Sequence, residues 1–358
     1  MLNDLNIRKM TSVKTITNLT VIPDSDFIEL ATVNNGWDVV VKKGTHKINE
    51  QVVYFEIDSI IPATDNRFLT IFSQEKPKNY QTNNGFSFGW RLHTKKIRGK
   101  ISQGLIMPLS DFPEINKNNQ LDLDNLLNIQ KYEPYIESRE AKGTFPYYIK
   151  KTSLERVQNI WDEISLDEKF YATLKVDGLS MTIFNYENDG KNSGICSNGV
   201  MLKEDKRNAY TNTAKNFKIL EKIQKFNFNI FSELKFKTPL NNNIAIQGEV
   251  YGLGLEKNRE KIKTIEFVGF NIYSIDNQQS LLPQNAFKIF EDMNIPHVPV
   301  IYKEKSLREL GVSTLADLLE LANIESLHGQ IAEGLVFRSC ERDFAFKVIN
   351  NQYLCKYK

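Results

Sequence analysis

The first hundred residues alternate short apolar runs with turn-forming segments. β-Branched and aromatic residues concentrate in the runs, while Pro, Asp, Asn and Gly fill the segments between them. Short strands at intervals of roughly ten residues, without long helical repeats, are typical of a small β-barrel or sandwich. Five or six strands in about 110 residues fit an OB-like barrel. The runs that predict strands span 13–22, 27–33, 37–43, 51–57, 90–97 and 102–109.

After this region the alternation of apolar runs and turns stops, and a different hydrophobic pattern begins at about residue 150. The segment 116–149 is polar at NKNNQLDLDN and is interrupted by Gly143 and Pro146, as is typical of a connector. From residue 150 onward, helical and strand patterns alternate. We therefore expect an OB-like barrel domain at 1–115, a connector at 116–149 and an α+β domain at 150–358. Its expected helices are 153–164, 213–232, 285–293 and 315–327, and its expected strands are a pair within 170–186, then 243–252, 266–273, 333–339 and 344–349.

Composition excludes several classes of protein. The chain is 41% hydrophobic and 25% charged, which is ordinary for a globular protein and not for a disordered or fibrous one. No apolar stretch approaches the roughly 20 residues that span a bilayer. The N-terminus lacks the apolar region of a secretory signal, so an intracellular, cytoplasmic protein without a membrane partner is expected. The three cysteines and four histidines are scattered, which indicates neither a disulfide framework nor a zinc site.

Positive charge concentrates in the N-terminal region. Residues 1–110 carry 14 Lys and Arg against 10 Asp and Glu, and residues 91–100 carry five Lys and Arg and no acid. Such a run is a candidate contact with a nucleic-acid backbone, through Arg91, Lys95 and Arg98. A solvated strand edge protected by lysines explains the same run equally well.

Five charged residues interrupt strand-like apolar runs of the second domain. They are Lys175 and Asp177 in TLKVDGLS, Glu249 in IQGEVYG, Glu333 in AEGLVF and Lys347 in AFKVIN. Burial of an unpaired charge is costly, and a solvent-facing position in an alternating strand could explain any one of them. It explains the set poorly, because each charge has apolar neighbours on both sides. These residues are therefore candidates for a chemical site.

The order of these residues resembles the motifs of the covalent nucleotidyltransferases. K-x-D-G at 175–178 is too short to be specific alone. It is followed by QGEVYG, the aromatic strand FVGFNIY, E-G-x-V-x-R at 333–338 and FAFKVI. This superfamily contains ATP-dependent DNA ligases, RNA ligases and mRNA-capping enzymes. The resemblance implies a nucleotidyltransferase (ATP-grasp-like ligase) domain with antiparallel sheets.

Two features favour RNA ligases within the superfamily. The N-terminal half is similar to the OB domain of the family-5 RNA ligases, so the resemblance covers nearly the whole chain. Only 11 residues follow Lys347, whereas DNA ligases and capping enzymes carry an OB domain after the corresponding motif. A DNA ligase, a capping-type guanylyltransferase and a non-catalytic OB-type nucleic-acid binder remain the alternatives.

The chemistry requires these residue types. A lysine amine has a pKa of about 10.4 in a model peptide, and nearby cations favour its neutral, nucleophilic form. Carboxylates hold a hydrated Mg²⁺ or Mn²⁺ that neutralises phosphate charge. The resemblance implies that Lys175 forms lysyl-AMP from ATP and that Lys347 binds the α-phosphate. It also implies that the carboxylates contact ribose and metal-bound water, and these are Asp177, Glu249 and Glu333.

The resemblance further implies a set of residues around the nucleotide. An aromatic side chain stacks on adenine, Phe267 by motif alignment with Phe270 as the second choice. Arg156 meets a phosphate, and Leu174, Gly178 and Ser197 line the nucleotide site. Asn198 replaces the usual arginine of one motif. The second lysine of the last motif is also absent, and Lys356 is a candidate replacement.

The implied activity is sealing of RNA. A ligase of this branch joins 3′-OH and 5′-phosphate RNA ends, at nicks in duplexes, through lysyl-AMP and RNA-adenylate intermediates. RNA repair is the expected role, and a monomer is the expected state.

Overall fold

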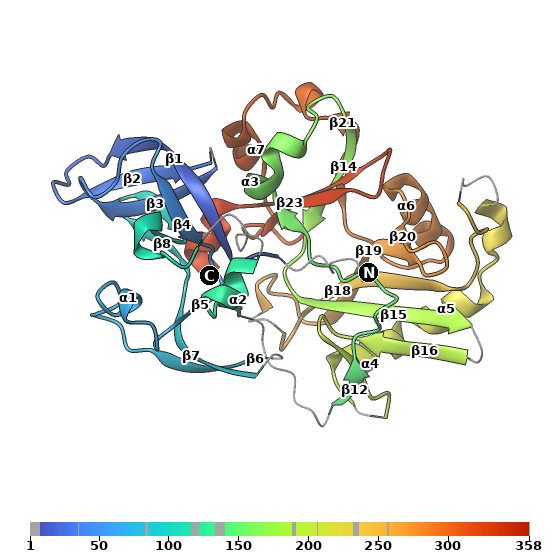
Figure 1. Ribbon diagram of the computed structural model, residues 1–358. Helices are drawn as coiled ribbons and strands as arrows, with labels where there is room; N and C mark the ends of the chain where they lie inside the picture. Colours follow the sequence, from blue (N-terminus) through green and yellow to red (C-terminus); the bar gives the residue numbers. More distant parts are fainter. Residues whose placement is uncertain are drawn as a thin grey trace. The chain divides into compact units, whose positions relative to one another are not determined.

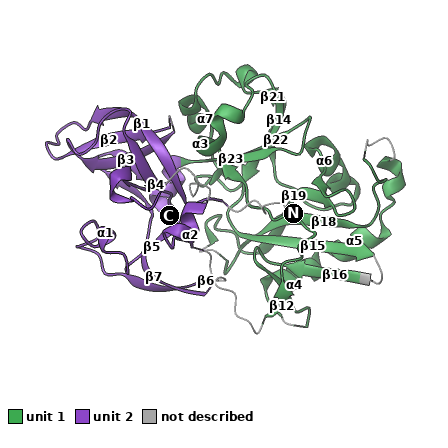
Figure 2. Ribbon diagram, in the orientation of Figure 1, with its two compact units in different colours: residues 1–7, 137–350 green, residues 8–136, 351–358 purple. Residues whose placement is uncertain are grey.

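The chain divides into two compact units, coloured in Figure 2. The computed structural model describes residues 8–34, 36–82, 85–115, 122–132, 140–187, 191–205, 207–231, 236–255 and 258–357. The barrel unit comprises residues 8–136 and 351–358, and the two-sheet unit includes residues 137–350. Residues 351–358, which the sequence placed with the second domain, thus belong to the barrel unit. Within the expected connector 116–149, residues 116–121 and 133–139 lie outside the described ranges.

The barrel unit is built on a five-stranded antiparallel sheet (Figure 1). The strand order is β10-β4-β1-β2-β3. Valine, isoleucine and aromatic residues dominate these strands, and their alternation sends side chains into two core clusters, one around Phe55 and the other around Trp37. The strands are β1 (Thr11–Val21), β2 (Ile28–Val33), β3 (Trp37–Lys42), β4 (Gln51–Phe55) and β10 (Leu105–Pro108).

A four-stranded sheet and a hairpin complete the barrel unit. The sheet has the order β11-β5-β7-β6, and β8 pairs with β9. The expected strands 90–97 and 102–109 are each divided, the first between β7 and β8 and the second between β9 and β10. The strands are β5 (Ser59–Pro62), β6 (Lys78–Thr82), β7 (Gly85–Arg91), β8 (Thr94–Ile97), β9 (Lys100–Gln103) and β11 (Gln130–Lys131).

Three short helices accompany these strands. They are α1 (Asn66–Leu69), α2 (Leu123–Leu126) and α8 (Asn351–Tyr357). Helix α8 contacts β8, and the Gln103 amide donates to the Asn351 side chain over 3.3 Å. Tyr353 and Leu354 are buried. The segment that follows the last strand of the two-sheet unit is thus packed into the barrel unit.

The two-sheet unit contains a seven-stranded and a five-stranded sheet. The orders are β12-β17-β16-β15-β18-β19-β20 and β13-β23-β22-β14-β21. The first sheet comprises β12 (Ala141–Thr144), β15 (Leu179–Glu187), β16 (Lys191–Cys196), β17 (Val200–Leu202), β18 (Ile244–Gly252), β19 (Ile265–Ser274) and β20 (Gln279–Ser280). The second comprises β13 (Glu155–Arg156), β14 (Lys169–Lys175), β21 (Val300–Ser306), β22 (Gly334–Ser339) and β23 (Ala345–Ile349).

Three of the four helices expected in this unit are shorter than the sequence predicts, and α6 is the exception. The expected helix 153–164 begins with β13, which pairs in parallel with β23, and only α3 (Val157–Ile160) is α-helical. The expected helix 213–232 is broken at Lys218, whose φ is 52°. Here the structure has α4 (Ala209–Asn216) and α5 (Ile219–Lys225). The two remaining helices are α6 (Pro283–Asp292) and α7 (Leu315–Leu321).

The five-stranded sheet has one apolar face. Phe170, Leu335, Phe337, Phe346 and Val348 pack there in one cluster with side chains of α3 and α7, which lie beside this sheet in Figure 1. Because strand side chains alternate between faces, the intervening residues of the same strands lie on the opposite face. None of the helices in the described ranges has both the length and the hydrophobicity needed to cross a bilayer.

Candidate active site

The charged residues of the five-stranded sheet lie on the face opposite the apolar cluster. Phe170 and Ala172 of β14 belong to the cluster, so Lys175 has the opposite parity. Lys347 likewise lies between Phe346 and Val348, which both belong to the cluster. Alternation therefore explains why a lysine ends β14 and another interrupts β23. Both lysines can face the same side of the sheet.

An ion pair joins Lys175 to Glu333. Nζ of Lys175 donates to Oε2 of Glu333 over 2.5 Å, and the two side chains are 24% and 6% exposed. The register of the strands explains the contact, because Lys175 pairs with Gly334 and Glu333 directly precedes that glycine. Residues 158 positions apart in sequence thus meet at the ends of adjacent strands.

Three carboxylates set the charge state of this amine. Burial lowers the pKa of the Lys175 amine, but the negative charges of Glu333, Glu249 and Asp177 outweigh it and raise the pKa above its usual value. The structure thus brings together four of the five charged residues that the sequence singled out. In this state the amine is protonated and not nucleophilic, so a cation that neutralises the carboxylates is needed to release it.

Two glycines allow the backbones to approach at this point. A Cβ on Gly178 would lie 2.3 Å from the Val250 carbonyl oxygen of β18. A Cβ on Gly334 would lie 2.0 Å from the Val348 carbonyl oxygen, and its φ of 142° suits only glycine. The glycines of K-x-D-G and E-G-x-V-x-R therefore let the strands pass close enough to juxtapose the charged residues.

The fifth charged residue, Lys347, lies beside Arg156. These residues are direct partners in the parallel pairing of β13 with β23. Arg156 is 5% exposed, although a buried arginine is uncommon. The structure thus brings together two cations that the resemblance assigns to phosphate contacts.

Arg259 is a site residue that the sequence reasoning missed. Its guanidinium forms an ion pair with Asp177, and both side chains are 10% exposed. The neighbours of Arg259 fix its segment, since Asn258 exchanges hydrogen bonds with Ile262 and Ser326 donates to Glu260 over 2.7 Å. The segment GLGLEKNRE indicated only a bend after the Glu249 strand. No local pattern marks this arginine, because its partner lies 82 residues away.

The two-sheet unit contains a cavity of about 250 Å³, and its lining includes strand neighbours of the five charged residues that the sequence singled out but not those five residues themselves. Gln247 lies two positions before Glu249, and Ala345 lies two positions before Lys347, so each pair shares a strand face. The volume lies just below the roughly 300 Å³ at which pockets for whole small molecules begin. The lining includes Glu155, Gln247, Phe270, Asn271, Arg338 and Ala345.

The two aromatic candidates have different environments. Phe267 is 1% exposed, packs 5.9 Å from the Phe217 ring and fills the space over Gly248. Phe270 lines the cavity, and its carbonyl accepts a hydrogen bond from Nε of Arg338 over 3.0 Å. Burial lowers the pKa of Arg338 to about 10. The ring of Phe270 is therefore the one that a ligand in the cavity can reach.

Ser197 and Leu174, which the resemblance also assigns to the nucleotide site, are held by hydrogen bonds to the backbone. Ser197 is 1% exposed, and its hydroxyl accepts from the Val200 amide in the turn between β16 and β17. The amide of Leu174 donates to the Pro299 carbonyl. Asn198 is exposed in the same turn as Ser197. Lys356 lies in α8, in the barrel unit.

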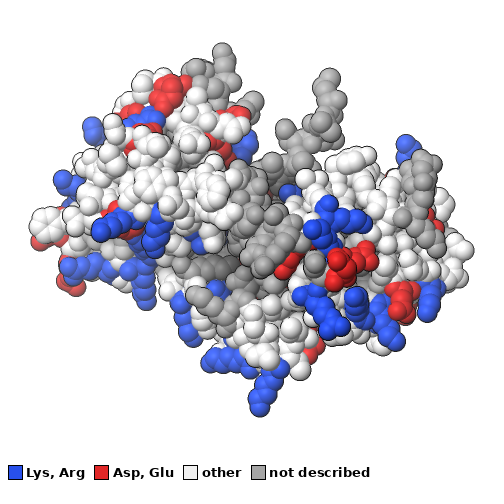
Figure 3. Space-filling model, turned by 90° about the horizontal axis from the view of Figure 1, so that it is seen from below, with Lys and Arg blue, Asp and Glu red and all other residues white. Residues whose placement is uncertain are grey.

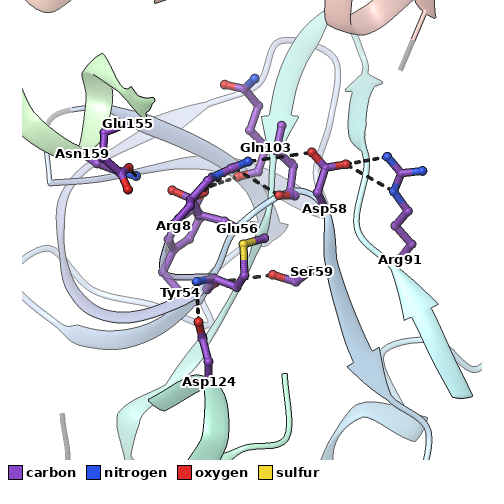
Figure 4. A network of polar contacts seen from close by, with 12 residues as sticks. Arg8, Tyr54, Glu56, Asp58, Ser59, Arg91, Gln103, Asp124, Glu155 and Asn159 are labelled. Carbon is purple, nitrogen blue, oxygen red and sulfur yellow. Dashed lines mark hydrogen bonds and ion pairs between the residues drawn. The ribbon is translucent and has the colours of Figure 1, made fainter. Parts of the chain in front are cut away.

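Arg91, Lys95 and Arg98 of the barrel unit, the expected contacts with nucleic acid, have different environments. Arg91 forms an ion pair with Asp58 at 2.6 Å, and Figure 4 shows Asp58 between Arg8 and Arg91. Arg91 also lies 3.8 Å from the ring centroid of Tyr132. Lys95 pairs with Glu75 at 2.7 Å. Arg98 is exposed at the tip of the β8–β9 hairpin, with a φ of 48°.

The carboxylate arrangement fits a hydrated divalent cation. The three carboxylates face two cations, the Lys175 amine and the Arg259 guanidinium that pairs with Asp177, which leaves one negative charge in excess. Within the described ranges, no three His, Cys, Asp or Glu residues are close enough to chelate a metal directly. Mg²⁺ usually keeps several waters and needs only one or two carboxylates, so contacts through water suit this arrangement.

Comparison with known proteins identifies the family. An OB-fold domain family matches residues 10–109, and the RNA ligase family matches residues 168–351. No curated protein sequence matches the chain.

Naegleria gruberi RNA ligase in an apo mutant form is 34% identical, with 98% of each chain covered and a TM-score of 0.83. A mutant of that enzyme with ATP and manganese is 34% identical over 99% of each chain, with a TM-score of 0.81. The same enzyme with pyrophosphate covers 98% of this chain and 99% of its own, at 34% identity and a TM-score of 0.82. With its family matched over more than half of its length and this relative aligned along nearly all of it, the chain belongs to the RNA ligase family.

Proposed function

We propose that the chain is an ATP-dependent RNA ligase that joins 3′-OH and 5′-phosphate ends at nicks in duplex RNA, through lysyl-AMP on Lys175. The observation that carries this proposal is the Lys175 amine, half-enclosed at a strand end among three carboxylates. The Naegleria relative was solved with ATP and manganese, and with pyrophosphate, which supports the same substrate and leaving group here. RNA repair is the role that such an activity serves.

The first step is the transfer of AMP to the protein. The neutral amine of Lys175 attacks the α-phosphorus, the phosphoanhydride bond to the β-phosphate breaks and pyrophosphate leaves. Lys347 and Arg156, side by side in β23 and β13, are positioned to bind phosphate oxygens. A hydrated Mg²⁺ or Mn²⁺ held by Asp177, Glu249 and Glu333 would supply charge neutralisation and favour the neutral amine.

The second and third steps transfer AMP to RNA and release it. An oxygen of the RNA 5′-phosphate attacks the lysyl phosphorus and the P–N bond breaks, so that Lys175 recovers its amine. The RNA 3′-hydroxyl then attacks the activated 5′-phosphate, loses its proton and expels AMP. Both steps need RNA ends held in line, which positioning and charge stabilisation provide.

We propose that the base of ATP occupies the cavity beside these residues, stacked on Phe270. Phe270 is one of the residues that line the cavity, whereas Phe267 is enclosed by Phe217 and Gly248. Glu155, Gln247 and Asn271 also line the cavity, and the two amides are ordered by hydrogen bonds, since Gln247 donates to the Lys150 carbonyl and Asn271 donates to Oε1 of Gln247. This assignment exchanges the first and second choices of the sequence analysis.

Labelling with α-³²P nucleotides in Mg²⁺ tests the proposal. ATP should give a covalent adduct that Lys175→Ala abolishes, while sealing of pre-adenylylated RNA partly survives in that variant because only the first step forms the lysyl bond. Lys169→Ala, at the exposed start of the same strand, is the matched control. A guanylate adduct would indicate a capping-type enzyme, sealing of DNA ends alone a DNA ligase, and absence of any adduct a non-catalytic binder.

A further inference from the structure

Two exposed phenylalanines lie on one face of β7 in the barrel unit. Phe86 is 77% exposed and Phe88 is 48% exposed, whereas Trp90, the next residue of the same parity, is 5% exposed. Trp90 stacks on Phe72 with the ring centroids 4.8 Å apart. The aromatic row thus begins in the core and continues, uncovered, along the β6–β7 ribbon. Large exposed aromatic side chains in a row are uncommon on a surface that binds nothing.

The partner strand leaves these rings accessible. In the register of β6 with β7, Asn79 lies opposite Phe88 and Gln81 lies opposite Phe86. Residues that face each other across a pair share one side of the sheet, so two exposed polar residues flank the rings. Neither side chain is large enough to cover a phenyl ring. The opposite side of the ribbon is different, since it carries Tyr80, which packs on Tyr132.

The ribbon lies within the most basic stretch of the chain. Residues 76–100 contain seven Lys and Arg and no Asp or Glu, and Lys76, Lys78 and Lys96 among them are exposed. Figure 3 shows Lys and Arg side chains at the left of the view, with Asp and Glu side chains among them, and further Lys and Arg side chains across the rest of this face. Such a charge distribution attracts a polyanion. Aromatic side chains within a basic surface are the arrangement by which OB-fold proteins hold single-stranded nucleic acid.

The spacing of the two rings fits stacked bases. Residues two apart in a strand are separated by about 6.7 Å, which is twice the 3.4 Å rise between stacked bases. Two rings at that distance can hold one base between them and can each stack a further base on the outer side. Paired bases inside a duplex cannot enter such a gap. The geometry therefore favours unpaired nucleotides over a continuous double helix.

We propose that the β6–β7 ribbon, through Phe86 and Phe88, is a stacking platform for unpaired bases of the RNA that the enzyme acts on. The inference rests on the proposed function only for the choice of RNA as the ligand. It differs from the expected contacts through Arg91, Lys95 and Arg98, because two of those residues are engaged by Asp58 and Glu75. The platform would hold a single-stranded segment of that RNA.

Binding of fluorescein-labelled oligo-uridylate of about 15 nucleotides to the full chain tests the platform. Replacement of both rings (Phe86→Ala with Phe88→Ala) should weaken the affinity at least about tenfold, since each stacked base contributes roughly 1–3 kcal/mol. The slope of log Kd against log salt should stay unchanged, because no phosphate contact is lost. Lys76→Ala with Lys78→Ala should instead lower that slope. Phe86→Tyr should bind like the wild type.

Phe27 provides a matched control. It is 79% exposed in the same unit but lies outside residues 76–100, so Phe27→Ala should bind the probe normally. In Phe86→Trp, the added indole emission should be quenched by the oligonucleotide. Binding by the double variant equal to that of the wild type would overturn the proposal. The proposal would also be overturned if the double variant lost as much affinity for a blunt duplex as for the single strand. A change in its oligomeric state with RNA binding intact would likewise contradict the proposal.

These measurements are independent of the proposed reaction. Adduct formation by the wild-type chain tests the ligase function, and probe binding tests the platform without any chemical step. Loss of probe binding in the double variant alone supports the platform even if no adduct forms.

Discussion

Nζ of Lys175 lies 2.5 Å from Oε2 of Glu333, so the proposed nucleophile is held as an ammonium by a residue of the same site. The partner carboxylates raise the pKa of the Lys175 amine even though burial acts in the opposite direction. In this arrangement the amine is protonated and unreactive. The amine becomes reactive when the charge of the carboxylates is neutralised.

Glu333→Gln should lower the pKa of Lys175. The substitution removes a negative charge that stabilises the ammonium, so the neutral fraction at any given pH rises and the reactivity curve moves to lower pH. Competitive labelling with acetic anhydride, read by mass spectrometry over a pH series, measures the midpoint. Glu309→Gln is the control, because Glu309 pairs with Lys169 at the far end of β14. An unchanged or higher midpoint in Glu333→Gln would show that the ion pair does not control the amine.

Glu249→Ala and Glu333→Ala should each reduce adduct formation by about a hundredfold or more. Charge stabilisation in a water-poor site contributes most in the transition state, where phosphate charge is redistributed. Rates of adduct formation at saturating ATP and Mn²⁺ provide the measurement. Thermal unfolding is the control. If the losses track large falls in melting temperature, the carboxylates are structural and the metal assignment fails.

Arg259→Ala should slow adduct formation by misplacing Asp177. Because Arg259 and Asp177 form an ion pair with both side chains 10% exposed, the double variant with Asp177→Ala should lose little more than Asp177→Ala alone. Arg259→Lys should restore part of the rate. Arg308→Ala is the matched control, since its ion pair with Asp167 is mostly exposed. Strictly additive losses would mean that Arg259 acts elsewhere.

Phe270→Ala should raise the apparent KM for ATP by roughly 5-fold or more, with the melting temperature nearly unchanged, because a stacked base contributes about 1–3 kcal/mol. Phe267→Ala should instead lower the melting temperature and leave the apparent KM for ATP nearly unchanged, since truncation of a buried phenylalanine costs about 3–5 kcal/mol of stability. Titration of ATP in the adduct assay and calorimetric unfolding separate the two. A raised KM with normal stability in Phe267→Ala would restore the original assignment to Phe267.

Local sequence patterns predicted the parts of the site that lie on strands. Lys175, Glu249 and Lys347 each interrupt an apolar run, and such an interruption is visible within a few residues. Which residues lie next to these side chains depends on the register between strands that are distant in sequence. The parallel pairing of β13 with β23, which seats Arg156 beside Lys347, turned the start of an expected helix into a strand.

Other features depend on tertiary contacts that no window of sequence contains. Arg259 reaches Asp177 through a loop that Glu260 fastens to Ser326. The order of the aromatic motif did not tell which ring faces the cavity, because β19 is irregular opposite Gln247 and Gly248, where the parity of its residues changes. The strand pattern thus predicted the sheets, whereas the different environments of Phe267 and Phe270 depend on the packing around them.

Helix α8 gives the barrel unit an unusual order of synthesis. A ribosome makes residues 8–136 first, then the whole two-sheet unit, and only afterwards residues 351–358, which bury Tyr353 and Leu354 in the barrel unit. Domains generally fold as units during translation, in the order in which they emerge. Here the barrel unit is synthesised first, but its last helix is synthesised only after the whole two-sheet unit. The nascent barrel therefore lacks α8 during that time. It reaches its final stability only after the strand carrying Lys347 has been made.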